Sequence, residues 1–460
     1  MASPSVPADP GSNPGTSAAS NPGSKPQAAP QRPPMLSTAQ ALERVLSAAR
    51  EVEGSEVLPT LAAHRRVLAQ PLYSTLDVPP MAISAMDGYA VCRADLAALA
   101  SASPTASTSL PLSLPISQRI PAGTQAQPLA AGTVARIFTG ATIPSGADAV
   151  VMQEMVTADG GERAVFGAQP EAGAWITAQG ADIARGTEIL SAGRRLDPQA
   201  LGLAASVGCA TLTVRRRVKV AVLFTGDELT MPGEPLKPGG IYNSNRFTLR
   251  ALLENLGCEV SDFGIVPDRF EATRDTLAAA AREHDLVLTS GGVSVGEEDH
   301  VKPAVSALGR LNLWQIALKP GKPLAFGEID RNALGPNSGT SSGPSSRPAY
   351  FIGLPGNPVS TFVTFLLFVR PFLLRLQGLT DVAPRIYPMR ADFSQAKADK
   401  RNEFLRARIN AQGGLDLFPN QSSAVLTSTV WGDGLIDNPP GHAIVAGEIV
   451  RFMPFSELLN

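Results

Sequence analysis

The most informative stretch of the chain is Leu288–Asp299, which reads LTSGGVSVGEED. The run Asp285–Leu288 leads into it and predicts a buried strand, and residues 301–308 after it predict a helix that ends at Gly309. A strand that turns through Ser-Gly-Gly into a helix leaves backbone N–H groups free at the helix entrance, where an anion can bind. Glycines also let the backbone approach a ligand closely. For this loop alone, an ordinary strand-to-helix turn is the alternative interpretation.

Three acidic residues, Glu297, Glu298 and Asp299, follow these glycines directly. Carboxylate oxygens are the ligands that hard divalent cations prefer. An anion seat beside carboxylates indicates a phosphate-bearing ligand that binds together with a divalent metal.

Strands alternate with helices over residues 215–380, which predicts an α/β domain with a mostly parallel sheet and helices on both faces. The expected strands are 218–224, 258–266, 285–290, 311–318, 324–329 and 349–353. The expected helices are one capped by Asn245, then 269–284, 301–308 and 358–377. Ligands of such sheets bind beyond the carboxyl ends of the strands. Three loops fall there: Thr225–Glu228, Ser290–Asp299 and Leu354–Pro358.

The flanking regions have other patterns. Residues 1–35 are rich in Pro, Ser, Ala, Gly and Asn, which predicts a disordered tail. Residues 36–78 and 180–214 form a predicted linker domain of helix and strand, whose first helix begins with a capping box at Ser37. Residues 79–179 predict a β-rich domain with strands at 137–141 and 149–152, and residues 381–460 predict a small β-barrel with strands at 386–393, 404–409, 424–430 and 444–453. Residues 101–109 and 332–348 are expected to be loop insertions.

Composition narrows the class of protein. The 460 residues exceed one typical domain, and the net charge of −2 argues against a nucleic-acid binder. The cysteines Cys92, Cys209 and Cys258 lie far apart, which fits a reduced compartment and predicts a cytoplasmic protein. The apolar run at 359–376 is interrupted by Arg370-Pro371, so we expect a buried helix rather than a membrane anchor.

Seven motifs occur in a fixed order along the chain. They are SAMDGYA at 84–90, FTGA at 138–141, FTGDEL at 224–229, IYNSN at 241–245, SGGVSVG at 290–296, KPGKP at 319–323 and LPGNP at 354–358. As an ordered set they closely resemble the molybdopterin molybdenumtransferases, the MoeA family that includes the gephyrin E domain. The resemblance covers roughly residues 36–460.

The resemblance implies an enzyme that takes adenylylated molybdopterin and molybdate, inserts molybdenum at the dithiolene, and releases AMP with Mg²⁺. It implies a homodimer in which the α/β domain of one subunit faces the β-rich domain of the other. It also implies partnership with a molybdopterin adenylyltransferase and with recipient molybdoenzymes.

The resemblance also assigns site residues. The implied catalytic residues are Asp87, Thr139, Asp182, Glu228, Asp268 and Asp299, of which Glu228 and Asp299 would hold the metal. The implied substrate-binding residues are Ser290, Gly291, Gly292, Ser294, Lys319, Lys322, Pro355, Gly356, Asn357, Arg406 and Ser423. Fixed positive charge suits a dianion such as molybdate, and a divalent cation relieves the repulsion among clustered acids. The alternatives are a solvated lysine pair, a helix cap at Asp299 and a plain turn threonine at Thr139.

Three other functions share features of this sequence. Molybdopterin adenylyltransferases and, more distantly, nicotinamide-nucleotide amidases contain a related α/β domain. The adenylyltransferases usually lack the flanking β-rich regions that this chain has. A non-catalytic, gephyrin-like scaffold or carrier is the third alternative, and the presence of Asp87, Glu228, Asp299 and Lys319 argues against it.

Overall fold

The computed structural model describes residues 35–101, 112–159, 161–293, 300–334 and 347–459. The predictions for the tail at 1–34, for most of both insertions, and for Ser294 and Asp299 therefore lie outside the described residues.

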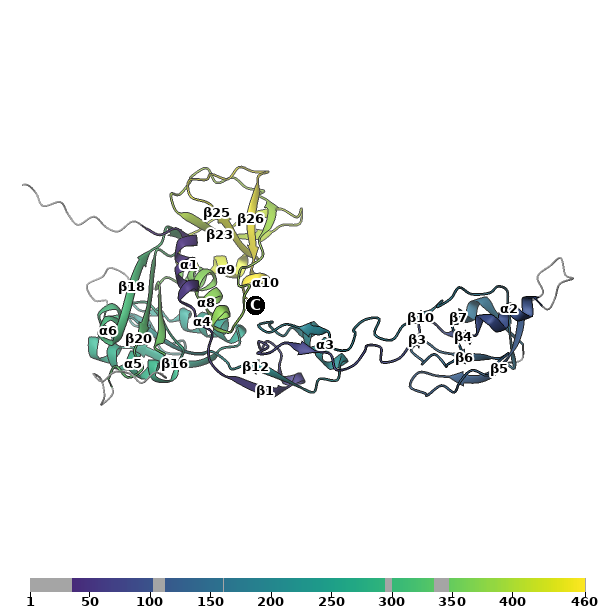
Figure 1. Cartoon of the computed structure of the whole chain (residues 1–460). Helices are drawn as coiled ribbons and strands as arrows, with labels where there is room; N and C mark the ends of the chain where they lie inside the picture. Colours follow the sequence, from purple (N-terminus) through teal and green to yellow (C-terminus); the bar gives the residue numbers. More distant parts are fainter. Residues whose placement is uncertain (1–34, 102–111, 160, 294–299, 335–346, 460) are drawn as a thin grey trace, which may run out of the picture. The chain divides into compact units, whose positions relative to one another are not determined.

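A six-stranded sheet forms the centre of the α/β domain (Figure 1). In spatial order its strands are β16 (Glu259–Val266), β13 (Lys219–Thr225), β17 (Leu286–Ser290), β21 (Ala349–Leu354), β20 (Pro323–Ile329) and β18 (Gly309–Gln315). The first four strands are parallel, and β20 and β18 pair antiparallel at one edge. The prediction of a mostly parallel sheet is confirmed.

Helices cover both faces of this sheet. One face packs against α1 (Thr38–Ala48), α4 (Ser244–Asn255), α7 (Pro358–Thr364), the π-helical segment η3 (Phe365–Val369) and α8 (Arg370–Leu376). The other packs against α5 (Phe270–Glu283) and α6 (Val301–Leu308). The period of two along β13 explains this double burial, because Val220 and Val222 face the first layer while Ala221 and Leu223 face the second.

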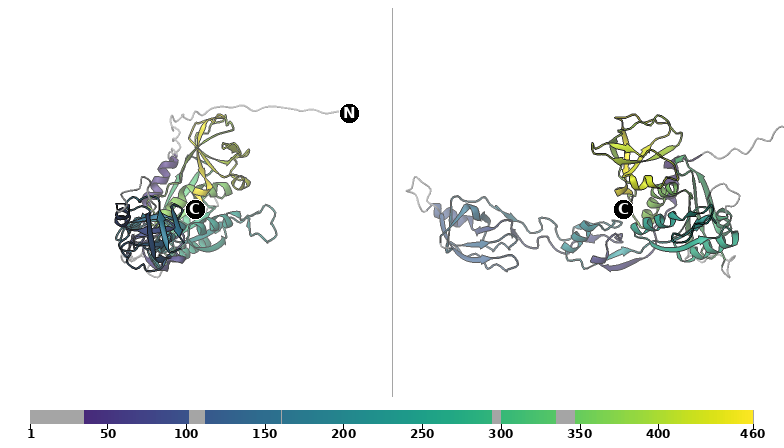
Figure 2. Two further views of the ribbon diagram at one scale, coloured as in Figure 1. Left: turned by 90° about the vertical axis from the view of Figure 1, so that its right-hand side faces the viewer. Right: turned by 180° about the vertical axis from the view of Figure 1, so that it is seen from behind.

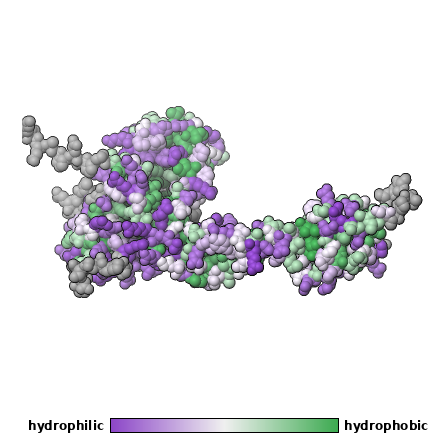
Figure 3. Space-filling model, in the orientation of Figure 1, coloured by the Kyte–Doolittle hydropathy of each residue, from purple (hydrophilic) through white to green (hydrophobic). Residues whose placement is uncertain are grey.

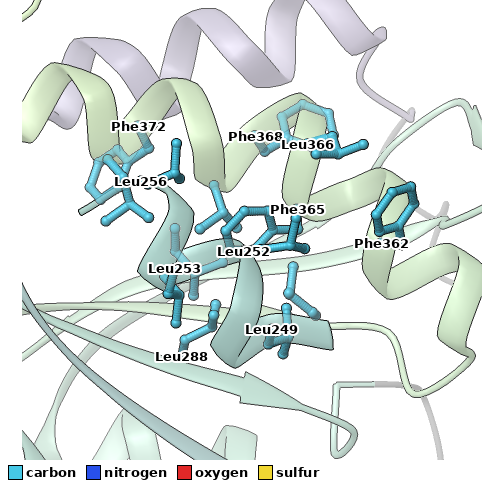
Figure 4. Packing of buried hydrophobic residues seen from close by; sticks show 14 of the residues in the cluster. Leu249, Leu252, Leu253, Leu256, Leu288, Phe362, Phe365, Leu366, Phe368 and Phe372 are labelled. Carbon is cyan, nitrogen blue, oxygen red and sulfur yellow. The ribbon is translucent and has the colours of Figure 1, made fainter. Parts of the chain in front are cut away.

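The first helical layer carries the largest hydrophobic core. Figure 4 shows the leucines of α4 in contact range of the phenylalanines of the long helical run, with Leu288 of β17 beneath them. Phe365 is 1% exposed there, so its truncation to alanine would cost about 3–5 kcal/mol of stability.

The helical run Pro358–Leu376 is, among the described residues, the one long and apolar enough to cross a membrane, yet 89% of its apolar window is buried inside the protein. This is the packing expected of a core helix. The run was expected to be one continuous helix, but η3 interrupts it just before Pro371. Proline has no N–H to donate to the carbonyl of the residue four positions earlier, so the regular hydrogen-bond ladder cannot continue there.

Hydrophilic residues cover much of the surface visible in Figure 3, with smaller hydrophobic patches between them.

The β-rich domain contains a second six-stranded sheet. Its strands in spatial order are β7 (Ala149–Met152), β4 (Gly88–Val91), β6 (Val134–Ile137), β5 (Leu112–Ile120), β9 (Arg163–Phe166) and β8 (Val156–Asp159), with α2 (Arg93–Ser101) and the short helix η2 (Gln153–Met155) beside them. The expected strand at 137–141 is wrong, because β6 ends at Ile137 and the next residues turn back so that the N–H of Ala141 donates to the carbonyl of Phe138. The strand at 149–152 is confirmed.

Short antiparallel pairs form the linker region. They are β1 (Ser55–Pro59) with β12 (Thr211–Arg215) and β2 (Leu72–Tyr73) with β11 (Glu188–Leu190), together with η1 (Thr60–Ala62) and α3 (Pro198–Ser206). A third short pair, β3 (Ile83–Ser84) with β10 (Ile176–Thr177), belongs to the β-rich domain. After β12, Arg216 makes a bidentate ion pair with Asp285, at 2.7 and 2.8 Å, and so connects the end of the linker to the start of β17.

The C-terminal residues form a small barrel, drawn in yellow in Figure 2. Its strands are β22 (Tyr387–Arg390), β23 (Asn402–Ile409), β24 (Leu415–Leu417), β25 (Gly434–Asn438) and β26 (Ile449–Pro454), with α9 (Thr427–Trp431) and α10 (Phe455–Leu458). A hydrogen bond of 3.0 Å from the N–H of Asp392 to the carbonyl of Leu415 closes the ring between β22 and β24. The expected strand at 424–430 is wrong, since α9 occupies this position.

One further strand connects the α/β domain to the barrel. β19 (Leu318–Lys319) pairs parallel with β23, which places Lys319 opposite Glu403. Leu318 is fully buried in the α/β core, so the alternation of a strand turns Lys319 away from that core.

Candidate active site

A cleft of about 790 Å³ opens beyond the carboxyl ends of β13, β16, β17 and β21. Its walls include residues 225, 226 and 228, 290–293 and 355–358 from the three loops expected from the sequence, the Lys319–Lys322 turn, and residues 401 and 421–423 of the barrel. The predicted site residues that it brings together are Glu228, Asp268, Ser290, Gly291, Gly292, Lys319, Lys322, Pro355, Gly356, Asn357 and Ser423. Most of the sequence-based site is therefore one continuous surface.

Asn245 joins the two glycine-rich loops of the cleft. Its side-chain amide donates to the Ser290 hydroxyl at 2.9 Å and to the Gly356 carbonyl at 2.8 Å. The Ser290 hydroxyl in turn donates to the carbonyl of Pro355 at 3.2 Å. The prediction that Asn245 caps the following helix is wrong: Asn243 is the cap and accepts from the N–H of Arg246. Asn245 is thereby free to fix the loops.

Two glycines are required by the close packing of these loops. Gly291 has a φ of 98°, and a Cβ there would lie 2.7 Å from the carbonyl oxygen of Thr225. Gly321, between the two lysines, has a φ of 109°, and a Cβ there would lie 2.5 Å from the Thr364 hydroxyl. Any side chain at either position would move a wall of the cleft.

Carboxylates gather at the ends of β13 and β16. The backbone N–H of Asp268 faces the Asp227 carboxylate at 3.4 Å, and the Glu228 carboxylate folds back over Gly226. Burial, followed by the negative charges of Asp227 and Glu228, raises the pKa of the Asp268 carboxyl. Repulsion of this kind is relieved by a bound cation. The oxygen donors suit Mg²⁺, although no group of three or more ligating side chains with metal-site geometry occurs among the described residues.

Cations gather where the barrel meets the cleft. The Lys319 ammonium lies 2.8 Å from Glu403 and 3.3 Å from Asp399, and the hydrogen bond to Glu403 raises the pKa of Lys319. Arg401 also lines the cleft and pairs with Asp399 at 2.9 Å. Hydrogen bonds from Arg401 hold the pKa of Asp399 well below its usual range. Lys322 is exposed, and within the described part of the chain its ammonium has no ion-pair partner.

Arg406, a predicted molybdate ligand, does not line the cleft. Its side chain is fully buried, and it donates to the Ser428 hydroxyl at 3.1 Å and to the Ser422 carbonyl at 3.2 Å. Burial lowers the pKa of its guanidinium to about 10. Through its hydrogen bond to the Ser422 carbonyl, Arg406 supports the Ser422–Ser423 wall from the buried side.

Three predicted catalytic residues lie outside this cleft lining. Asp87 and Thr139 contact each other in the β-rich domain, where the Asp87 carboxylate accepts from the Thr139 N–H at 2.8 Å and from its hydroxyl at 2.7 Å. These bonds lower the pKa of Asp87. Asp182 is exposed between the linker and the β-rich domain. The described lining contains no residue of the β-rich domain.

The sequence did not single out several residues as part of the cleft. They are Asn243, Asn245, Arg401, Gln421 and Ser422. The IYNSN motif contained the first two, but nothing in the barrel sequence marked the other three. Two buried polar atoms at the cleft, Oγ1 of Thr225 and Nδ2 of Asn243, have no hydrogen-bond partner among the described residues. Polar atoms left unpaired in this way are typical of a site that receives a ligand or water.

The central domain defines the broad class of the protein. Residues 221–375 match the family domain described as "Probable molybdopterin binding domain". Residues 36–208 match the MoeA N-terminal region (domain I and II), and residues 388–455 match the MoeA C-terminal region (domain IV).

Similarity to whole proteins extends over most of the chain. The chain is 37% identical to the molybdopterin molybdenumtransferase of Haemophilus influenzae over 434 residues, and this aligned region covers 93% of this chain and 100% of that protein. The corresponding protein of Nostoc sp. is 34% identical over 386 residues, with 83% and 84% covered. The chain therefore belongs to the MoeA family of molybdopterin molybdenumtransferases.

Solved structures of the family have the same fold. The molybdopterin biosynthesis moeA protein from Pyrococcus horikoshii superimposes with a TM-score of 0.75 at 26% identity, covering 92% of this chain and 100% of that one. Gephyrin of Dictyostelium discoideum is 35% identical over 255 residues, which span 53% of this chain but 35% of gephyrin.

Proposed function

We propose that this chain inserts molybdenum into molybdopterin, with adenylylated molybdopterin and molybdate as substrates and AMP as a product. One observation carries the proposal: a single cleft of about 790 Å³ is lined by both Lys319 and Lys322 and by both Glu228 and Asp268. A cleft of this size accommodates a nucleotide-sized ligand. Basic groups suit an oxyanion, and clustered acids suit the cation of a phosphoanhydride site.

Different groups of the cleft would bind the substrate, the oxyanion and the cation. The glycine loops at 290–292 and 355–357 bring backbone N–H groups close to the substrate, and Asn245 holds both loops together. Lys322 and the hydroxyl of Ser423 would receive the oxyanion at the barrel side of the cleft. Glu228, with Asp227 and Asp268, would hold Mg²⁺, which when bound supplies Lewis-acid polarisation of the phosphoanhydride. The predicted role of Asp299 stays a prediction.

We further propose that the active unit is a homodimer. The support is that Asp87 and Thr139, which the family resemblance assigns to the site, contact each other in the β-rich domain rather than lining the cleft. A second copy of the chain would supply them to the cleft of the first. This arrangement would account for the assignments of Asp87 and Thr139 without a rearrangement of either domain.

The test is AMP release from adenylylated molybdopterin by the full chain, with molybdate and Mg²⁺ added or omitted. We expect release that requires both. Formation of the adenylylated intermediate from ATP and molybdopterin would instead make the protein an adenylyltransferase. Tight binding without turnover would make it a carrier or scaffold.

A further inference from the structure

The ammonium of Lys319 is hydrogen-bonded to a buried carboxylate, that of Glu403. Glu403 is 1% exposed and accepts a hydrogen bond from the Lys319 ammonium at 2.8 Å. The two residues are register partners between β19 and β23, so the backbone itself keeps them opposite each other. This contact is built into the junction between the α/β domain and the barrel.

The Glu403 carboxylate cannot turn away from Lys319. Its second oxygen accepts from the side-chain amide of Gln395 at 3.0 Å and lies 3.4 Å from that of Asn438. Asn438 is itself 2% exposed and bonded to the carbonyl of His442 at 3.1 Å. A carboxylate with both oxygens occupied in a buried network keeps one orientation.

Asp399 adds a second negative charge beside the cations at the barrel side of the cleft. It contacts Lys319 at 3.3 Å and Arg401 at 2.9 Å. Three cations, Lys319, Lys322 and Arg401, line the cleft here, and the two carboxylates of Asp399 and Glu403 lie against two of them. One net positive charge is left to meet an oxyanion, and it sits on the exposed Lys322.

We infer that Glu403 is a positioning residue that fixes Lys319 and keeps the affinity of the cleft for free molybdate low. The inference rests on the proposed function, because it takes molybdate as the anion. A transferase gains nothing from tight binding of the ion that it must hand on, since binding that is equally strong before and during transfer does not raise the rate. The negative charge of Glu403 beside Lys319, in the same cleft as the receiving ammonium of Lys322, limits such binding.

The experiment measures oxyanion binding to the full chain by titration calorimetry, with sodium molybdate and sodium sulfate as probes. In Glu403→Gln the acceptor for Lys319 is retained but the charge is lost. We expect this variant to bind both oxyanions roughly tenfold more tightly, because an uncompensated cation then faces the anion. Its turnover number for AMP release should fall at the same time. A loss of fold could not produce a gain of affinity.

Asp399→Asn provides a second variant, since its side chain is more accessible than that of Glu403, and it should tighten binding in the same direction. The control is Asp416→Asn, which removes the same charge from an exposed pair with Arg408 on the barrel and should change neither affinity nor turnover. Unchanged or weaker oxyanion binding in folded Glu403→Gln and Asp399→Asn would overturn the inference. AMP release by the unaltered chain is read separately, so failure of the proposed function is distinguished from failure of this inference.

Discussion

The side-chain amide of Asn245 lies 2.9 Å from the hydroxyl of Ser290 and joins the first turn of α4 to the end of β17. The same amide reaches the carbonyl of Gly356 at 2.8 Å, beyond the end of β21. Three segments that are distant in the sequence are thus fixed to one another at the floor of the cleft. Their relative position decides where the backbone N–H groups of both glycine loops point.

The first prediction concerns this contact. Asn245→Ala removes the donor and should lower kcat/KM for AMP release about tenfold, because both substrate loops lose their common anchor. The free energy of unfolding should fall by only about 1 kcal/mol. Steady-state kinetics and thermal unfolding measure the two effects. Asn255→Ala is the matched control at the other end of α4, where the side chain has no hydrogen bond among the described residues. Equal losses in the two variants would contradict the role of Asn245.

The second prediction follows from the raised pKa of Asp268. The folded protein holds this proton more tightly than the unfolded chain, so ionisation of Asp268 opposes folding. The stability associated with the proton is fully present below the ordinary pKa of an aspartate and is lost as the pH rises through the raised value. Asp268→Asn should therefore raise the Tm of the metal-free protein at neutral pH and leave it nearly unchanged in acid.

The effect of Mg²⁺ on the Tm of the same two proteins tests whether Asp268 helps to bind the cation. A cation held by the acidic residues stabilises the folded state by mass action. Added Mg²⁺ should raise the Tm of the unaltered chain at neutral pH and have a smaller effect on Asp268→Asn. Identical Mg²⁺ responses in both proteins would argue that the cation binds elsewhere.

The third prediction tests the two-chain site. Glu228→Ala and Asp87→Asn should each abolish AMP release while leaving the dimer intact, because each removes one acid from every site. When the two variants are mixed and allowed to exchange subunits, half of the dimers carry one intact site. Activity should then recover to about a quarter of that of the unaltered chain. No recovery, despite exchange verified by mass spectrometry, would place both acids in one chain's site.

The sequence predicted the α/β domain well because its signals are local. Period-two burial in β13, the glycine after β17 and the leucines of α4 act within a few residues of the elements that they define. The loops at the strand ends, which contain Glu228 and Ser290, follow from that topology, whereas Lys322 was assigned only by the family resemblance.

What the sequence could not provide depends on tertiary contacts. Residues 424–430 have the composition of a strand, yet α9 forms because Trp431 packs edge-on against Phe418 and Ser428 accepts from Arg406. Asn243 and Asn245 are both competent caps and both line the cleft, and the hydrogen bond to Ser290, distant in sequence, distinguishes the loop anchor Asn245 from the cap Asn243. The pairing of Lys319 with Glu403 spans 84 residues of sequence.

The last prediction separates two cations that the sequence treated alike. Lys322 is exposed in the cleft, whereas Arg406 is fully buried and hydrogen-bonded to Ser422 and Ser428. Lys322→Met should weaken molybdate binding about tenfold or more with an unchanged Tm, because it removes the charge that faces the anion without removing packing. Arg406→Met should lower the free energy of unfolding by about 1–3 kcal/mol, because it leaves buried acceptors unpaired. Calorimetric molybdate titrations and thermal unfolding on the two variants check this division. If Arg406→Met kept its Tm and lost only oxyanion binding, Arg406 would have to reach the ligand, and the Ser422–Ser423 wall would have to move to admit it.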